Sequence, residues 1–398
     1  MYRKWPANIC PIGSSRKLAC IALALLAAAS LAAPAGTGAA PPRLLDASLS
    51  QAGRRLIFTV RTSEPVVLKR LERRPSGVAS RFLCMELHRQ ARGGSRRLCL
   101  GGAPNSHRGA GLELLNARGQ VTKSKTIAAR LRRPDPDELV LALLPADAGL
   151  LPRRYRWRVV VDSDCRHAGN CEESLPAQGE RLFRLRPVRA VGCTGGSAGL
   201  LTNGPRERKV VALTFDDGPS DYTSGFLDVL RRERVPGTFF EIGQEIDGRE
   251  ATLRRILREG DEIGNHTSHH TEYPGYADIA PTTSLIESAT HFRPCLFRPP
   301  GGAVDSSVIA AAAADGMRTV TWDVDPADWS NPGSAAVYNR VVDAVQPGSI
   351  VLMHDGGGDR AGTLAALPRI IDTLRARGYR FATVTELLGE RMLYRPYG

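Results

Sequence analysis

The chain of 398 residues lacks the features of several protein classes. Beyond its first 32 residues, no apolar run is long enough to span a membrane. No Cys-x-x-Cys pair is present, which argues against a zinc site built from cysteines. Aromatic residues make up 6% of the chain and do not form a stacking platform among its basic residues. These absences argue against a later membrane span, a cysteine metal cluster and a nucleic-acid partner.

The N-terminus has the pattern of a secretory signal. Arg16 and Lys17 precede the apolar run LACIALALLAAASLAA, and Ser30 and Ala32 fit a small-x-small cleavage site. We therefore predict a signal peptide at residues 1–32 and a secreted or extracytoplasmic protein, in the cell wall or periplasm. An uncleaved membrane anchor is the alternative.

Removal of the signal leaves six cysteines, an even number that favours disulfides in an oxidising compartment. Two pairs are close in sequence and would form local clips, which leaves a third pair far apart. The predicted disulfides are Cys84–Cys99, Cys165–Cys171 and Cys193–Cys295. Free buried thiols are the alternative, because sequence alone does not fix the pairing.

Charge divides the chain into two halves. Residues 33–193 carry 29 Lys+Arg and 14 Asp+Glu, a net charge of +15, whereas residues 194–398 carry 21 and 27, a net charge of −6. The segment GCTGGSAGLLTNGP lies at this change and has the composition of a linker. We therefore predict a basic N-terminal domain at residues 33–193, a linker at 194–205 and a second domain at 206–398.

The basic half has the alternation of β-strands. In RRYRWRVVV, Tyr155, Trp157 and Val159 alternate with arginines, so apolar groups face one side and basic groups the other. RRLIFTVRT and RLFRLRP show similar runs, which predicts a small β-sandwich-like domain. Its basic face could contact an anionic wall polymer such as teichoic acid or peptidoglycan. We favour the alternative, in which the arginines only solvate an outer face.

The second half alternates strands and helices. The segments with the composition of strands are VVALTF, GTFFEI, DEIGN, CLFR, RTVTWD, SIVLMH and YRFATV, and helical segments follow them. About seven such units predict an α/β domain with a parallel sheet, and in barrel form its active site lies at the carboxyl ends of the strands. Ionisable groups follow five strands, in TFDDG, NHTSHH, RPPGG, DVDPADW and HDGGG. Each alone could be a turn or a cap, but five at one edge predict a site.

The stretch GNHTSHH carries three of the eight histidines. His266 and His270 are four residues apart, and on a helical turn that spacing places both on one side, whereas His269 points elsewhere. A carboxylate from the first strand end would complete a set of two histidines and one carboxylate, as in catalytic zinc sites. Such an ion lowers the pKa of a water toward about 7 and polarises a carbonyl. A neighbouring carboxylate could take the water's proton, and an imidazole could protonate a leaving group.

These motifs resemble, in order and spacing, those of the NodB-like polysaccharide deacetylases, carbohydrate esterase family four. TFDDG, HTSHH, RPPGG, DPADW and LMH carry the resemblance, which covers about residues 205–390. It implies an incomplete (β/α) barrel that removes N- or O-acetyl groups from sugars with a divalent metal, and the ligand types favour Zn²⁺. It implies an acetylated polysaccharide substrate, such as peptidoglycan or chitin-like oligomers.

By position, the resemblance assigns a role to each candidate site residue. Asp216 matches the catalytic base, Arg298 the partner of that base, and His354 the catalytic acid. Asp328 matches the carboxylate that orients the acid, with Asp325 as a possible substitute. The metal ligands match Asp217, His266 and His270. The substrate-binding residues match Pro300, Gly301 and Trp329, the last as a wall on which a sugar could stack.

One position departs from the family's pattern. The family usually has tyrosine after the two prolines, where this chain has Gly301. The backbone N–H that helps to hold the oxyanion remains, but the side-chain wall and some rigidity are lost. The departure therefore affects the expected shape of the substrate more than the expected chemistry.

Two other functions fit parts of the pattern. A non-catalytic wall- or carbohydrate-binding protein on the same fold would have lost the base or the acid, and both Asp216 and His354 are present. A non-haem iron oxygenase also uses two histidines and a carboxylate, but it has no evident role for Asp216 and His354. We therefore predict a metal-dependent deacetylase, and metal content together with acetate release would separate the three.

Overall fold

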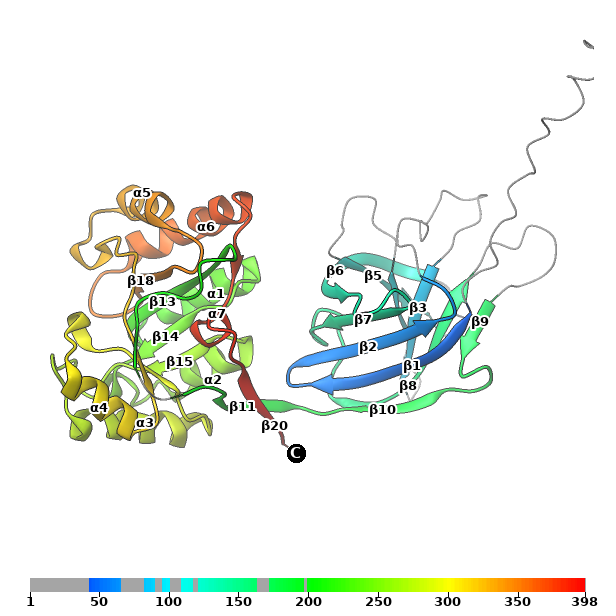
Figure 1. The fold of residues 1–398 in the computed structure, drawn as a ribbon, viewed down its shortest axis with the longest axis horizontal. Helices are drawn as coiled ribbons and strands as arrows, with labels where there is room; N and C mark the ends of the chain where they lie inside the picture. Colours follow the sequence, from blue (N-terminus) through cyan, green and yellow to red (C-terminus); the bar gives the residue numbers. More distant parts are fainter. Residues whose placement is uncertain are drawn as a thin grey trace, which may run out of the picture.

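The computed structural model describes residues 43–65, 82–89, 95–100, 109–116, 121–162, 172–196 and 199–397. The predicted signal peptide and the predicted Cys165–Cys171 disulfide lie outside these residues. The described chain forms an all-β N-terminal lobe and an α/β C-terminal lobe (Figure 1). Within the described residues, no helix has both the length and the apolar character needed to cross a membrane.

The N-terminal lobe is one sheet of ten antiparallel strands. Its strand order is β1-β2-β7-β6-β5-β4-β3-β8-β10, with β9 paired to β8. The long strand β6 joins the two halves of the sheet, because its first part pairs with β5 and its last part with β7. The strands are β1 Leu44–Ala52, β2 Arg55–Thr62, β3 Phe82–Arg89, β4 Arg96–Leu100, β5 Gly109–Leu115, β6 Val121–Arg132, β7 Glu138–Leu143, β8 Arg153–Asp162, β9 Glu172–Leu175 and β10 Arg181–Leu185.

Alternation along the strands places the apolar side chains of both halves in one core. Leu56 and Phe58 of β2 are buried, as are Tyr155 and Trp157 of β8, and all four belong to the same apolar cluster. Burying a large aliphatic or aromatic side chain is worth about 1.5–3 kcal/mol relative to leaving it exposed. The two halves therefore pack across a shared core, and the predicted β-sandwich-like domain is confirmed.

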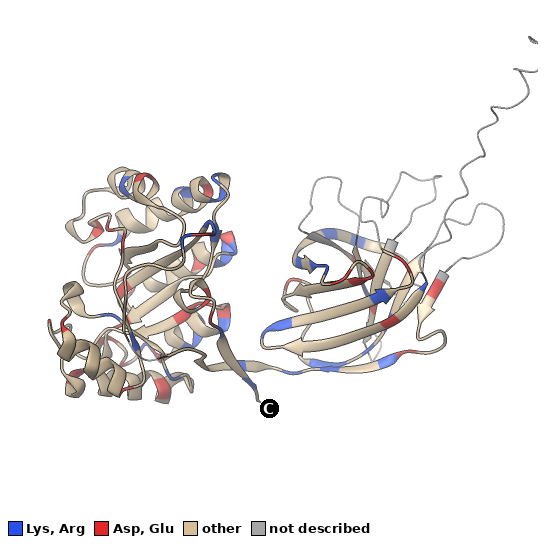
Figure 2. Cartoon of the chain, in the orientation of Figure 1, with Lys and Arg blue, Asp and Glu red and all other residues tan. Residues whose placement is uncertain are grey.

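Some of the basic residues of this lobe are neutralised by ion pairs. Lys and Arg are spread over its strands (Figure 2). On β3, Glu86 is buried and accepts hydrogen bonds of 2.8 Å from the Nε atoms of Arg97 and Arg158. Burial alone would raise the pKa of Glu86, but hydrogen bonds from His88, Arg97 and Arg158 lower it to about 2. These arginines have a role within the sheet itself.

The C-terminal lobe contains a parallel sheet that curls into an incomplete barrel. Its strand order is β12-β17-β16-β15-β14-β13-β18, with β19 paired to β13. The sheet nearly closes where Val324, after β17, pairs with Val351 of β18. The predicted α/β fold class with an incomplete barrel is therefore confirmed. The strands are β12 Leu200–Leu201, β13 Val210–Gly218, β14 Thr238–Glu241, β15 Glu262–Asn265, β16 Leu296–Phe297, β17 Arg318–Val320, β18 Ile350–His354 and β19 Arg380–Phe381.

Helices pack on this sheet through their apolar faces. In α1, Phe226 and Leu230 are fully buried four residues apart, and the Phe226 ring lies 5.1 Å from that of Phe215 on β13. The helix α3 begins at Tyr276, before the predicted segment TTSLIESA, and runs through Pro281. The helices are α1 Thr223–Glu233, α2 Glu250–Glu259, α3 Tyr276–Thr290, α4 Ser306–Ala314, α5 Ser334–Ala344, α6 Ala361–Ala376 and α7 Val384–Leu387, with 3-10 turns η2 Gly243–Glu245, η3 Pro300–Gly302 and η4 Asp328–Ser330.

The segment between the lobes is fastened to the C-terminal lobe. Strand β11 (Val188–Cys193) pairs with the C-terminal strand β20 (Met392–Pro396) rather than with the N-terminal sheet. Leu200–Leu201, inside the predicted linker, form β12 at the edge of the parallel sheet. The chain therefore joins the C-terminal framework a few residues earlier than the predicted boundaries place it.

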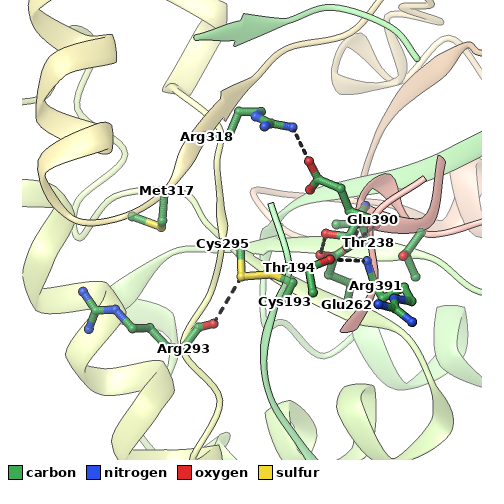
Figure 3. The surroundings of a disulfide bond; sticks show 12 residues. Cys193, Thr194, Thr238, Glu262, Arg293, Cys295, Met317, Arg318, Glu390 and Arg391 are labelled. Carbon is green, nitrogen blue, oxygen red and sulfur yellow. Dashed lines mark hydrogen bonds and ion pairs between the residues drawn. A yellow bond between two sulfur atoms is a disulfide. The ribbon is translucent and has the colours of Figure 1, made fainter. Parts of the chain in front are cut away.

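Two predicted disulfides fall within the described residues, and the structure contains both. Cys84–Cys99 joins the neighbouring strands β3 and β4. Cys193–Cys295 joins the end of β11 to the segment that leads into β16 (Figure 3). Next to it, Thr194 and Arg391 exchange hydrogen bonds, which continue the β11–β20 pairing. This disulfide therefore ties the segment between the lobes to the strand that precedes Arg298.

Candidate active site

Strand ends bring the sequence motifs to one edge of the parallel sheet. Asp216 and Asp217 lie at the end of β13, and its parallel neighbour β18 ends at His354. Asp216 and His354 are register partners across these strands. β15 ends directly before His266, and β16 ends directly before Arg298. Parallel strands present their carboxyl ends at the same edge, which explains why these groups meet.

Asp217, His266 and His270 form a group that could hold a metal ion, since one ligand atom of each lies within 4.8 Å of the others. Asp217 Oδ1 is 3.4 Å from His266 Nε2 and 3.2 Å from His270 Nε2. His266 Nδ1 lies 2.7 Å from the carbonyl oxygen of Arg298, so Nδ1 carries the proton and donates it there.

In the neutral ring, His266 Nε2 then presents a lone pair toward Asp217. Asp217 Oδ1 is itself buried without a hydrogen-bond partner among the described residues. Two acceptors that face each other, with a second imidazole beside them, fit a cation between them. The donor set of two imidazoles and one carboxylate is the set that catalytic zinc sites use.

The electrostatics of the group follow from its burial and its neighbours. Burial raises the pKa of Asp217, but the His266 and His270 imidazoles outweigh this effect and hold the pKa well below its ordinary value. The Asp217 carboxylate, 3.2 Å from His270 Nε2, raises the pKa of His270 against the effect of burial. Asp217 is therefore ionised at neutral pH and provides the negative charge that a cation requires.

The histidine loop is not helical, and the predicted helical turn is wrong. Residues 266–275 contain no helix, and both Thr267 and His270 have positive φ, at 70° and 58°. The side chain of Asn265 accepts a hydrogen bond of 2.8 Å from the Thr267 N–H, which shapes the start of the loop. His266 and His270 therefore meet through an irregular turn, with ring centroids 5.1 Å apart.

His269 lies outside the group of potential metal ligands. Its side chain is 70% exposed, and its Nδ1 lies 2.9 Å from Asp278 Oδ1. Because its ring pairs with a carboxylate of α3, His269 is placed to fix the loop rather than to bind the same ion.

Asp216 and Arg298 form a buried ion pair beside the metal group. Arg298 is fully buried, and its Nη1 donates to Asp216 Oδ1 at 2.7 Å and to the Thr214 hydroxyl at 2.7 Å. The guanidinium also lies 4.1 Å from the ring centroid of Phe240. Burial lowers the pKa of Arg298, and the charge of Asp216 opposes this. Since Arg298 binds Oδ1, the second oxygen of Asp216 faces His266, at 3.8 Å from its Nε2.

His354 is held by Asp328 on the other side of the site. Its Nδ1 lies 2.7 Å from Asp328 Oδ1, and the second oxygen of Asp328 accepts from the His354 N–H and from Thr363. Burial lowers the pKa of His354, but the bond to Asp328 and the nearby carboxylates raise it above its ordinary value. Asp325 instead accepts from the Ala327 N–H. The structure therefore places Asp328, and not Asp325, against His354.

The three predicted substrate-binding residues differ in exposure. Pro300 is buried, Gly301 is exposed, and Trp329 is 58% exposed. Gly301 has φ 60° within the turn η3, a conformation in which a residue with a side chain is strained. The glycine therefore fits the backbone that this turn adopts.

The sequence reasoning missed two buried carboxyl groups next to the site, Glu241 of β14 and Asp355 after His354. Both are fully buried, and neither carboxylate oxygen of Glu241 has a hydrogen-bond partner among the described residues. Both carboxyls crowd Gly218, where a Cβ would lie 2.7 Å from Glu241 Oε2 and 2.8 Å from Asp355 Oδ2. Burial, and the charges of Asp355 and Asp216, raise the pKa of Glu241 well above its usual range, and burial raises that of Asp355 to about 7. The glutamate within the apolar strand GTFFEI was the available signal.

Comparisons with known proteins identify relatives of the C-terminal lobe. A family model described as polysaccharide deacetylase matches residues 203–320, a range that includes the metal group and Arg298 and ends before Asp328 and His354. The chain is 42% identical over 192 residues to a peptidoglycan-N-acetylglucosamine deacetylase of Bacillus cereus, with 46% of this chain and 90% of that protein covered. It is 37% identical over 187 residues to a chitooligosaccharide deacetylase of Sinorhizobium fredii, with 42% and 87% covered.

Among solved structures, a peptidoglycan N-acetylglucosamine deacetylase aligns with a TM-score of 0.47 and 32% identity, over 48% of this chain and 94% of that one. The carboxylate and histidine groups of this chain gather at the carboxyl ends of the strands of the matched domain. Because of its identity to these relatives over most of their length, the chain belongs to the polysaccharide deacetylase family, the NodB-like enzymes of carbohydrate esterase family four.

Proposed function

We propose that this protein is a metal-dependent hydrolase that removes acetyl groups, chiefly N-acetyl groups, from an extracytoplasmic polysaccharide such as peptidoglycan or chitin-like oligomers. One observation carries the proposal. The pair Asp216–Arg298, the group around Asp217 and the pair His354–Asp328 converge at one edge of the sheet. The names of the relatives from Bacillus cereus and Sinorhizobium fredii support the substrate class.

Asp217, His266 and His270 would hold the ion, for which the donor set favours Zn²⁺. When bound, it supplies a Lewis acid that polarises the acetyl carbonyl and acidifies a water. His266 is oriented for this by its bond to the Arg298 carbonyl, and such bonds to the far side of a ligand ring raise metal affinity.

Asp216 acts as the base. Arg298 fixes one carboxylate oxygen and leaves the other facing the metal group, where it can take a proton from the attacking water. His354 acts as the acid, because its Nδ1 is engaged by Asp328 and its Nε2 remains to protonate the leaving amine or hydroxyl. The Gly301 N–H would hold the oxyanion, and the exposed Trp329 would stack on a sugar ring.

The experiment is acetate release from a panel of peptidoglycan, chitin oligomers and acetylxylan, with zinc-loaded protein and Asp216→Asn as control. We expect release from the N-acetylated glycans, and a rate lower by about 10²–10⁴-fold in Asp216→Asn with metal retained. Glycan binding without acetate release from any of the panel would refute the proposal. That result would favour the alternative, a non-catalytic cell-wall or carbohydrate-binding protein on the same fold.

The role of the N-terminal lobe is a separate part of the proposal. We propose that residues 33–193 act chiefly as a structural partner of the catalytic lobe. Besides the Cys193–Cys295 disulfide, Arg54 in the β1–β2 turn donates a hydrogen bond of 2.7 Å to the Arg258 carbonyl of α2. Anchoring to an anionic cell wall is the rival role, and salt-sensitive binding of the whole protein to wall material would support it.

A further inference from the structure

The place beside Gly301 that a larger side chain would fill is taken by Glu272. A Cβ built on Gly301 would lie 3.4 Å from Glu272 Oε1 and 4.0 Å from its Cγ, which is ordinary van der Waals contact. Gly301 is exposed, and its N–H is the proposed donor to the oxyanion. The carboxylate of Glu272 therefore lies next to the residue against which the reacting acetyl group would rest.

The position of Glu272 in the chain also brings it to the site. It follows His270, a potential metal ligand, by two residues, so the two Cα atoms are at most about 7 Å apart. The same loop carries Tyr273, which is 60% exposed. The helix α3 begins with Tyr276, which is 51% exposed. Along the chain, the carboxylate therefore lies between a potential metal ligand and two exposed aromatic residues.

Within the described residues, no cation is paired with Glu272. Its side chain is exposed, and in the part of the chain that the structure describes it makes no ion pair and no hydrogen bond. Some exposed acids of this lobe are paired, such as Asp228 with Arg255 at 2.7 Å. A carboxylate left without a cation at the edge of a site is available to a cation on the substrate.

We infer that Glu272 is a specificity-determining residue that favours glycans carrying a free amino group beside the sugar to be deacetylated. The inference rests on the proposed function. An ammonium group on the neighbouring sugar would be attracted by the carboxylate, whereas a sugar bearing a carboxylate would be repelled. At about 5 Å in water, the attraction of two unit charges corresponds to roughly a fourfold preference, and added salt screens it.

The chemistry links this preference to the reaction itself. Hydrolysis breaks the C–N bond of the acetamide, the water oxygen stays with the acyl carbon as acetate, and the nitrogen takes up protons to become an ammonium group. Each turnover on a polymer therefore creates the cation that Glu272 recognises. The product of one cleavage is a better substrate for cleavage at the adjacent sugar.

The test compares two soluble substrates. One is the fully N-acetylated chitin tetramer, and the other is the same tetramer with one free amino group. We expect zinc-loaded wild-type protein to favour the amine-bearing tetramer in kcat/KM by about fourfold at low salt, and much less at about 0.5 M salt. Glu272→Gln should bring the ratio to about 1, and Glu272→Lys should invert it. Thermal unfolding of each variant verifies that the fold is retained.

Glu207→Gln is the matched control, because Glu207 is exposed and precedes β13, at the opposite strand end from the site. It removes the same charge and should keep the wild-type ratio. A wild-type protein without preference, or a Glu272→Gln variant that keeps the full preference, would overturn the inference while leaving the proposed function intact. No acetate from either tetramer with wild-type protein would instead refute the proposed function, and the inference with it.

Discussion

The pair Asp216–Arg298 offers the sharpest test of how the site is built. Replacing Arg298 by methionine keeps much of the side-chain volume but removes the donor to Asp216 Oδ1 and the hydrogen bond of 3.0 Å to the Thr321 carbonyl. Asp216 is 2% exposed, so its carboxylate would be left buried and unpaired. Breaking one side of a buried ion pair costs about 3–5 kcal/mol, and we expect Arg298→Met to lose that much free energy of unfolding.

The double variant Arg298→Met with Asp216→Asn separates loss of packing from loss of charge balance. The amide carries no charge, so the double variant should be more stable than Arg298→Met alone by about 1–3 kcal/mol. Urea unfolding at neutral pH with metal removed gives these free energies, and acetate release should be lost in both variants. A loss below about 1 kcal/mol in Arg298→Met, or a double variant less stable than the single one, would refute the reasoning.

Four further predictions follow from other contacts. His266→Ala should abolish binding of one divalent ion per chain, whereas His269→Ala should retain it, as measured by metal content after dialysis. Equal loss of metal in the two variants would show that the ligand assignment is wrong. His354→Ala should lower acetate release by about 10²–10⁴-fold with metal retained, and a near-normal rate would remove it from the mechanism. Burial raises the pKa of Glu262 from 4.5 to about 7, so the folded state keeps a proton that the unfolded chain loses, and this group should lower stability by up to about 3 kcal/mol as pH rises from about 4.5 to 7. Glu262→Gln should remove that part of the slope in urea unfolding, and an unchanged slope would contradict the prediction. Cys295→Ser opens a disulfide that spans 102 residues and should cost about 2–5 kcal/mol in thermal unfolding, whereas an unchanged melting temperature would argue against a structural role.

The parallel sheet could be predicted from sequence because its signal is local. Short apolar strands alternate with helical segments, and a parallel sheet gathers the carboxyl ends of its strands at one edge, so the motifs after β13, β15, β16 and β18 had to meet there. The predicted pairs Cys84–Cys99 and Cys193–Cys295 also agree with the structure. The meeting of the strand ends depends on order along the chain and on rules that hold for any sheet of this kind, whereas sequence alone left the cysteine pairing open.

Other features depend on contacts between distant segments, and only the tertiary structure decided them. Asp325 and Asp328 are both aspartates of one motif, and the sequence does not show which of them contacts His354. In the structure Asp328 contacts the His354 ring, whereas Asp325 accepts from the Ala327 N–H. His266 and His270 meet through an irregular turn and not through the predicted helical spacing. Glu241 becomes buried at the end of β14, without a hydrogen-bond partner among the described residues, because neighbouring strands cover it. Glu272 comes to lie beside Gly301 because two separate loops pack at the same edge. A sequence sets which groups are available, but burial and proximity arise when the strands come together, and those two quantities set the pKa values and the charge that a substrate meets.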